Sequence, residues 1–120
     1  MIPAVSTILQ NAQTANANGT SVNLTGYQFL GVQVSGTFLG AVNFEASLDG
    51  IGWCPVSLIQ TSSASLYGAV TSFSSYGVQL FINDTNHPAS ALGNFRARTS
   101  GMISGSVTVQ AIQSGPVVLQ

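Results

Sequence analysis

The sequence predicts one all-β domain, an antiparallel β-sandwich of jelly-roll or immunoglobulin-like kind with about eight strands. Two observations support this prediction. Apolar and polar residues alternate in short segments, most cleanly over Ala41–Leu48, where Val42, Phe44, Ala46 and Leu48 share one face. Turn-forming Gly, Asn, Ser and Asp separate these segments at short intervals. A chain of 120 residues suits a single domain with its own hydrophobic core.

The composition excludes two classes of protein. Hydrophobic residues make up 45% of the chain and charged residues 4%, yet no apolar run approaches the ~18–20 residues of a spanning helix. We therefore expect no membrane partner. Arg96 and Arg98 are the only basic residues besides His87, so the clustered Lys and Arg of a nucleic-acid site are missing. A net charge of −1 gives little repulsion between copies and favours association with other subunits.

The N-terminal sequence and the single cysteine indicate folding in a reducing cytoplasm. The first ten residues, MIPAVSTILQ, lack the charged region and sustained apolar stretch of a secretory signal. Cys54 has no partner for an internal disulfide. We expect Cys54 to be a small buried hydrophobic residue beside Trp53.

We divide the chain into an N-terminal arm at residues 1–20, a β-sandwich domain at 21–114 and a C-terminal tail at 115–120. Val5–Leu9 fits a short strand or one helical turn, and Gln10–Thr20 reads as a loop or extended arm. Both ends carry apolar residues outside the sandwich pattern, so we expect them to order against a neighbouring chain. Packing of both ends on their own sandwich is the alternative.

Strands are expected between residues 21 and 112, in chain order at Ser21–Thr25, Gln28–Ser35, Ala41–Leu48, Cys54–Leu58, Leu66–Val70, Tyr76–Asn83, Asn94–Thr99 and Ser106–Ile112. Asp49-Gly50 supplies a turn that suits positive φ, and Pro55 indicates an edge strand or bulge. Further turns or loops are expected at Gly36–Gly40, Gln60–Ser65, Ser72–Ser75, Asn83–Leu92 and Gly101–Gly105.

The alternation within these strands predicts which side chains are buried. In Tyr76–Asn83 it places Val78, Leu80 and Ile82 inward and Phe81 outward. Trp53 is expected to plug one end of the core. The predicted core consists of Val32, Val34, Val42, Phe44, Trp53, Val56, Leu80, Phe95, Val107 and Val109.

Catalytic and metal-binding chemistry has little support. His87 follows Asp84 by three residues in a polar loop, and a solvated loop histidine explains this pattern better than a catalytic triad. Asp49, Asp84, Glu45 and His87 lack the spacing of a known metal site. We expect no enzyme activity, no cofactor and no metal.

Three further features concern binding. Glu45 is expected to form a cross-strand ion pair with Arg96 or Arg98, since all three lie on the polar faces of their strands. The aromatic residues Trp53, Tyr67, Tyr76 and Phe81 fit either a sugar-stacking platform or core and interface packing, and we favour the second. The candidate interface residues are Ile2, Val5, Ile8, Leu9, Phe81, Ile112, Val117, Val118 and Leu119.

Three segments resemble a β-sandwich domain that recurs in structural proteins of tailed phages and prophages. They are VSGTF at Val34–Phe38, VNFEASLDGIGWCPV at Val42–Val56 and RARTSGMISGSVTV at Arg96–Val109. The resemblance covers roughly Ser21–Ile112, and the chain departs from the pattern in its long neutral arm and in Cys54.

The resemblance implies a virion component without an active site, most specifically a capsid decoration (cement) protein on the capsid surface. Its implied partners are the major capsid protein or other virion proteins, and its implied assembly is a homo-oligomer, with a trimer preferred. The alternative is a carbohydrate-binding or host-recognition module of a phage tail or surface assembly.

Overall fold

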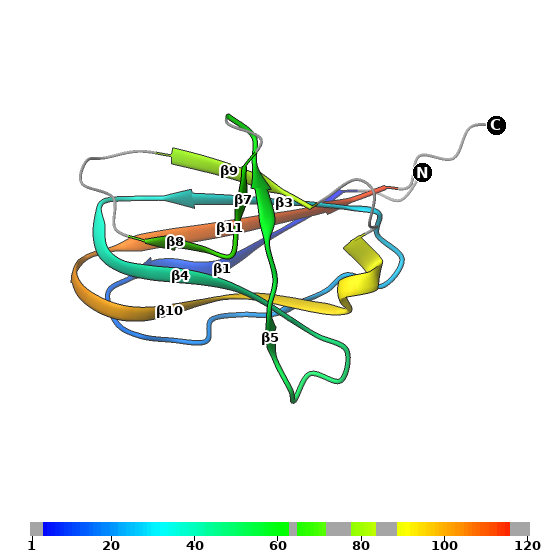
Figure 1. The fold of residues 1–120 in the computed structure, drawn as a ribbon, viewed down its shortest axis with the longest axis horizontal. Helices are drawn as coiled ribbons and strands as arrows, with labels where there is room; N and C mark the ends of the chain where they lie inside the picture. Colours follow the sequence, from blue (N-terminus) through cyan, green and yellow to red (C-terminus); the bar gives the residue numbers. More distant parts are fainter. Residues whose placement is uncertain (1–3, 63–64, 72–77, 84–88, 116–120) are drawn as a thin grey trace.

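A computed structural model describes residues 4–62, 65–71, 78–83 and 89–115 of the chain. Within them the fold is a β-sandwich of two antiparallel sheets, whose long strands run lengthwise through the molecule (Figure 1). The elements are β1 Val5–Gln13, β2 Val22–Asn23, β3 Phe29–Ser35, β4 Phe38–Ser47, β5 Cys54–Pro55, β6 Leu58–Gln60, β7 Leu66–Tyr67, β8 Ala69–Thr71, β9 Val78–Ile82, the 3₁₀-helix η1 Ala89–Leu92, β10 Asn94–Gly105 and β11 Val107–Ser114.

The two sheets divide the strands unevenly. The six-stranded sheet has the order β1-β11-β3-β9-β6-β7, and the five-stranded sheet has the order β2-β10-β4-β5, with β8 also paired to β4. β7 and β8 lie in different sheets although only Gly68 separates them. The single strand expected at Leu66–Val70 is therefore two short strands, between which the chain crosses from one sheet to the other.

Two further crossings between the sheets lie against each other. β3 leads into β4 through Gly36, and β10 leads into β11 through Gly105, with φ values of +113° and +79°. The Ser106 amide donates a hydrogen bond of 3.1 Å to the Thr37 carbonyl and so joins the two turns. A Cβ at Gly36 would collide with the Ser106 carbonyl, and one at Gly105 with the Thr37 carbonyl. Both positions therefore require glycine.

The core lies between the sheets and is centred on aromatic residues from both of them. Phe44 of β4 meets Phe81 of β9 edge to face at 5.2 Å between ring centroids, and lies 6.1 Å from Phe95 of β10. All three side chains are buried. Seven of the expected core residues are confirmed as buried: Val32, Val34, Val42, Phe44, Phe95, Val107 and Val109.

The expected orientation of β9 is wrong. Phe81 is 1% exposed, whereas Leu80 is 48% exposed and Val78 and Ile82 are also exposed. The segment VQLFI has three aliphatic residues on one face and one phenylalanine on the other. The structure buries the face with the aromatic ring, because Phe81 packs against both Phe44 and Tyr67.

Expectations around the turn after β4 also need correction. β4 ends at Ser47, so Leu48 lies in the turn and is 81% exposed. Pro55 of β5 pairs with Glu45, whose side chain is on the outer face of the sheet. Alternation places Trp53 on that same face, where it is half-buried rather than in the core. β5 is an edge strand, as Pro55 indicated.

The same short edge strand explains two more differences. Cys54 lies opposite Ala46 on the core side, but it lines an open hollow of about 430 Å³ and is exposed rather than buried. Val56 is half-buried and packs against the margin of the core. A two-residue strand has no further strand beyond it to cover these side chains.

Most of the segment expected to be an arm belongs to the sandwich. β1 pairs with β11, and its Leu9 lies in the core. Gln10 of β1 is also buried and donates 3.0 and 2.9 Å hydrogen bonds to the carbonyls of Ala17 and Ala97. Since Ala97 belongs to β10, Gln10 links the two sheets. The described part of this segment packs on its own sandwich, as the alternative to docking on a neighbour expected, whereas residues 116–120 of the tail lie outside the described residues.

Other boundaries differ more simply. The turn expected at Gly101–Gly105 is the end of β10, which continues past a register shift between Ser100 and Ser104. The loop expected from Gln60 begins after that residue, which ends β6. The turn at Ser72–Ser75 and the residues Tyr76, Asp84 and His87 lie outside the described residues.

Candidate interaction surfaces

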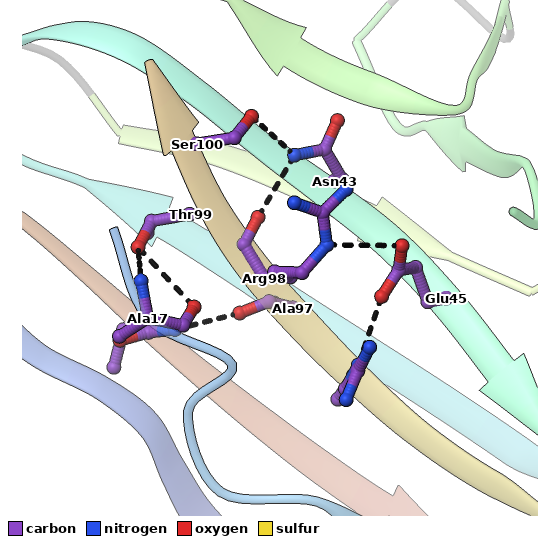
Figure 2. Close-up of polar contacts among 9 residues, drawn as sticks. Ala17, Asn43, Glu45, Ala97, Arg98, Thr99 and Ser100 are labelled. Atoms are coloured by element: carbon purple, nitrogen blue, oxygen red, sulfur yellow. Dashed lines mark hydrogen bonds and ion pairs between the residues drawn. The ribbon is translucent and has the colours of Figure 1, made fainter. Parts of the chain in front are cut away.

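The outer face of the five-stranded sheet carries an ion cluster on its two central strands. Antiparallel pairing of β4 and β10 places Arg96 opposite Glu45 and Arg98 opposite Asn43. Glu45 Oε1 accepts a 2.8 Å hydrogen bond from Arg96 Nε, and Oε2 accepts one of 3.1 Å from Arg98 Nε. Figure 2 shows the Arg98 side chain reaching across to Glu45. The expected cross-strand ion pair is present and includes both arginines.

The cluster is fixed on both sides by its neighbours. The Arg96 guanidinium carbon lies 4.2 Å from the centre of the Trp53 ring, a cation–π contact. Asn43 Nδ2 donates to the Arg98 carbonyl at 3.0 Å and to Ser100 Oγ at 2.8 Å (Figure 2). Burial raises the pKa of Glu45, but hydrogen bonds and charge from Arg96 and Arg98 outweigh it and leave that pKa below its usual value. The carboxylate is therefore ionised at neutral pH.

A rigid turn beside this face presents two apolar side chains. Asp49 Oδ1 accepts hydrogen bonds from the amides of Ile51 at 2.8 Å and Gly52 at 2.9 Å, and from Ser47 Oγ at 2.9 Å. These bonds lower the pKa of Asp49 to about 2. Gly50 has φ +77°, as the Asp-Gly pair indicated. Leu48 and Ile51 consequently project into solvent from an ordered turn, which extends away from the long strands in Figure 1.

The outer face of the six-stranded sheet is uncharged and largely apolar. Strand pairing aligns one residue from each strand in a transverse row, namely Ser6, Ile112, Gly31, Ile82, Ile59 and Leu66. A second row contains Ile8, Gln110, Gln33 and Leu80. We call these two rows the apolar face. Leu66 is 65% exposed and Ile8 50% exposed, so this face offers large side chains to a partner.

The apolar face is hollowed at its centre. Gly31 has no side chain, and a Cβ there would approach Ile112 Cγ2 to 3.0 Å. A hollow of about 360 Å³ lies over it, with Ile112, Leu80 and Ile82 among the apolar residues that line it. Gln110 contributes an amide to the lining and donates a 2.6 Å hydrogen bond to Ser6 Oγ.

The structure divides the interface candidates into three groups. Val5, Ile8 and Ile112 are exposed, whereas Leu9 and Phe81 are buried in the core of this chain and are unavailable to a partner. Ile2, Val117, Val118 and Leu119 lie outside the described residues. Sequence reasoning missed Leu80 and Ile82 because the orientation of β9 was reversed, and it missed Ile59 and Leu66 because their place beside β9 depends on strand pairing. The sequence shows that Leu80 and Ile82 share one face of the strand, but only packing decides whether that face points to the core or to solvent.

The sugar-stacking platform is not assembled as first considered. Phe81 is buried, Tyr67 packs edge to face on it at 5.8 Å between ring centroids, and Trp53 lies on the other sheet. Within the described residues, no three His, Cys, Asp or Glu side chains gather into a potential metal site. No helix in this part of the chain has the length and apolar character needed to cross a membrane.

Comparison with known proteins identifies the fold. No family model matches the sequence, and a search of curated proteins gives no match. The crystal structure of SPBc2 prophage-derived protein YomS matches with a TM-score of 0.78 and 16% identity, over 92% of each chain. The PBSX exported protein XepA matches with a TM-score of 0.78 and 12% identity, over 92% of this chain and 37% of that one. At these identities the likeness shows a shared β-sandwich fold.

Proposed function

We propose that this protein is a non-enzymatic structural component of a phage particle, and specifically a capsid decoration protein that binds the outside of the shell. The observation that carries the proposal is the apolar face, an uncharged surface that crosses all six strands of one sheet. YomS, which shares the fold, is named as a prophage-derived protein and supports a phage context. The partners would be the major capsid protein or other virion proteins.

The apolar face is better suited to permanent contact with another protein surface than to exposure to water. Burying one large aliphatic side chain stabilises a contact by about 1.5–3 kcal/mol, and this face exposes several. Neither of its two rows contains a charge that would have to be desolvated on binding. Such a surface is therefore favourable for docking on a shell or on another copy of the chain.

Mass spectrometry of purified particles tests the proposal. The chain should sediment with capsids at a fixed ratio to the major capsid protein, and purified chain should rebind to particles that lack it. Absence from particles, with no binding when purified chain is added back, would show that it is not a decoration protein. Recovery only with detached tails would place it in the tail instead.

A pair of variants tests whether the apolar face makes the contact. Ile112→Lys places a charge in the first row, and because Ile112 is 47% exposed the fold should tolerate it. Ile103→Lys is the matched control, since Ile103 is 77% exposed near the end of β10 in the other sheet. Ile112→Lys should reduce particle binding at least tenfold and the control should not. Equal binding by both variants would exclude this face.

A carbohydrate-binding module is the second candidate function, and the hollow over Gly31 is the observation in its favour. The hollow combines amide and hydroxyl groups with aliphatic walls, which is a usual composition for a ligand site. A glycan array gives the test. A defined glycan hit that disappears in Gln33→Ala, without any particle binding, would favour this function over decoration.

A further inference from the structure

The ion cluster on the five-stranded sheet holds more positive than negative charge. One carboxylate, Glu45, faces two guanidinium groups, Arg96 and Arg98. The whole sequence contains only two basic residues of the Lys and Arg type and three acidic residues. A chain of net charge −1 therefore concentrates both of its arginines at one place, where Glu45 balances only one of the two positive charges among the described residues.

Hydrogen-bonding capacity is also left over. Both bonds to Glu45 come from Nε atoms, so within the described part of the chain the terminal Nη groups stay available to an incoming acceptor. The Arg98 side chain is 35% exposed, the Arg96 side chain 16% and the Glu45 side chain 10%. Glu45 is thus largely covered, while Arg98 presents its donors to solvent. A guanidinium group matches the geometry of a carboxylate, which can accept two parallel hydrogen bonds from it.

The cluster is held in place before any ligand arrives. Arg96 is held between Glu45 and the Trp53 ring, and Arg98 is held by its hydrogen bond to Glu45. Fixing these long side chains in advance reduces the conformational entropy that binding would otherwise cost. One arginine is enough for an ion pair with Glu45 between the two strands, so that pair alone does not account for the second arginine.

We propose that the Arg96–Arg98 pair receives the carboxylate of an Asp or Glu side chain from a partner protein. The inference rests on the proposed function in that the partner would be a virion protein. A protein is favoured over an acidic sugar because neither described hollow includes these arginines, so the cluster lies on an open surface. Arginine and tryptophan are also the residues that most often dominate binding at protein interfaces.

The test uses the intact chain and two short peptides. The probe is acetyl-Gly-Glu-Gly-Glu-Gly-amide, and the control is the same peptide with Gln in place of Glu. The only two arginine Nε–H signals and the only tryptophan indole signal report on the cluster in proton–nitrogen NMR spectra. The Glu peptide should shift these signals saturably at constant ionic strength, and the Gln peptide should not.

Two results of this titration would overturn the proposal. One is a response to the Glu peptide no larger than the response to chloride at the same ionic strength. The other is tighter binding of glucuronate than of the Glu peptide, which would identify the cluster as a site for acidic sugars.

Variants separate the site from a general charge effect. Arg98→Gln should weaken Glu-peptide binding at least fivefold. Arg98→Lys should weaken it less, because lysine keeps the positive charge but lacks the planar guanidinium that can donate two parallel hydrogen bonds. Ser62→Asp changes the net charge by the same amount at an exposed position after β6, and should leave binding unchanged. Circular dichroism and thermal melts confirm folding of each variant. Equal weakening of Glu-peptide binding by Arg98→Gln and Ser62→Asp would indicate a general charge effect and overturn the proposal.

Particle binding distinguishes failure of this proposal from failure of the proposed function. If particles bind wild-type and Arg98→Gln chains equally, the carboxylate site does not contribute to docking, and the proposed decoration function is not contradicted. A saturable Glu-peptide response without any particle binding would support the site and contradict decoration.

Discussion

At the residue scale, single side chains fix the position of much larger elements. Gln10 hydrogen-bonds across the sandwich to the Ala97 carbonyl and ties β1 to the opposite sheet. Phe81 decides which face of β9 turns inward by packing against Phe44. Glu45 joins both arginines on adjacent strands. In a chain with so few charges, the position of these elements therefore depends on a few aromatic, amide and ionic contacts between segments distant in sequence.

The first prediction concerns the centre of the core. Phe44→Ala should destabilise the fold by ~3–5 kcal/mol, because Phe44 is fully buried and contacts two other phenylalanines. Leu48→Ala is the control, and it should change stability by less than ~0.5 kcal/mol because Leu48 is exposed. Urea denaturation followed by circular dichroism measures both. A loss below ~1 kcal/mol for Phe44→Ala would contradict its central position in the core.

The second prediction concerns acid stability at Asp49. Its pKa is about 2 in the folded chain, below the ordinary aspartate value near 3.9. The ionised carboxylate therefore stabilises the fold fully above about pH 4, and this contribution is lost as the pH falls through about 2. Asp49→Asn removes the titrating group and should lose less stability than wild type between pH 4 and 2.

Melting temperatures measured from pH 5 to pH 2 test this expectation. Glu45 also has a lowered pKa and titrates in both proteins, so the difference between the two curves isolates Asp49. Parallel curves over the whole range would show that the turn hydrogen bonds do not hold in solution.

At the scale of elements, connections between the sheets matter as much as the strands. The β3–β4 and β10–β11 turns contact each other through the Ser106–Thr37 hydrogen bond. β7 and β8 cross the sandwich again at Gly68. The segment after β1 is tied to β10, since Thr99 Oγ1 accepts a 2.8 Å hydrogen bond from the Ala17 amide (Figure 2). β1 is thus an integral edge strand of the domain.

A glycine pair tests the importance of the turn crossings. Gly105→Ala should destabilise the fold by at least ~1–3 kcal/mol, because its φ of +79° disfavours a side chain and a Cβ would collide with the Thr37 carbonyl. Gly52→Ala is the control, since a Cβ there meets no atom within 4 Å. Chemical denaturation of the two variants gives the comparison. Equal stabilities would mean that the turns shift easily to admit a side chain.

At the scale of the whole molecule, the two outer faces have opposite chemistry. The five-stranded sheet carries Glu45, Arg96 and Arg98, whereas the two rows on the six-stranded sheet carry no charge. A molecule of this kind can use one face for apolar contact and the other for directed ionic contact. This arrangement suits a subunit that is packed between other proteins, as the proposed function requires.

The whole-molecule prediction is self-association through the apolar face. We expect a homo-oligomer, with a trimer preferred, whose mass in multi-angle light scattering falls toward that of the monomer in Ile112→Lys. The physical reason is that a lysine on this face would have to be desolvated in the assembled state. A strict monomer at high concentration for the wild-type chain, and on the particle, would count against oligomer formation.

The sequence by itself determined the β-sandwich, most strand positions and the ion pair. Strict alternation in Phe29–Ser35, Asn94–Thr99 and Val107–Ala111 specifies buried faces, because side chains of a strand point alternately to its two sides. The same rule placed Glu45, Arg96 and Arg98 on outer faces. Asp49-Gly50 specified its turn through local hydrogen bonds and positive φ, which depend on no distant residue.

Only the tertiary structure decided the orientation of β9, the position of Trp53 and the place of β1. In VQLFI both faces carry apolar residues, so contacts of Phe81 with residues far along the chain settle the choice. Trp53 follows the register of a two-residue edge strand, and β1 finds its partner in β11, some hundred residues away. Local pattern cannot specify these features, because the free energy that selects them comes from packing between segments distant in sequence.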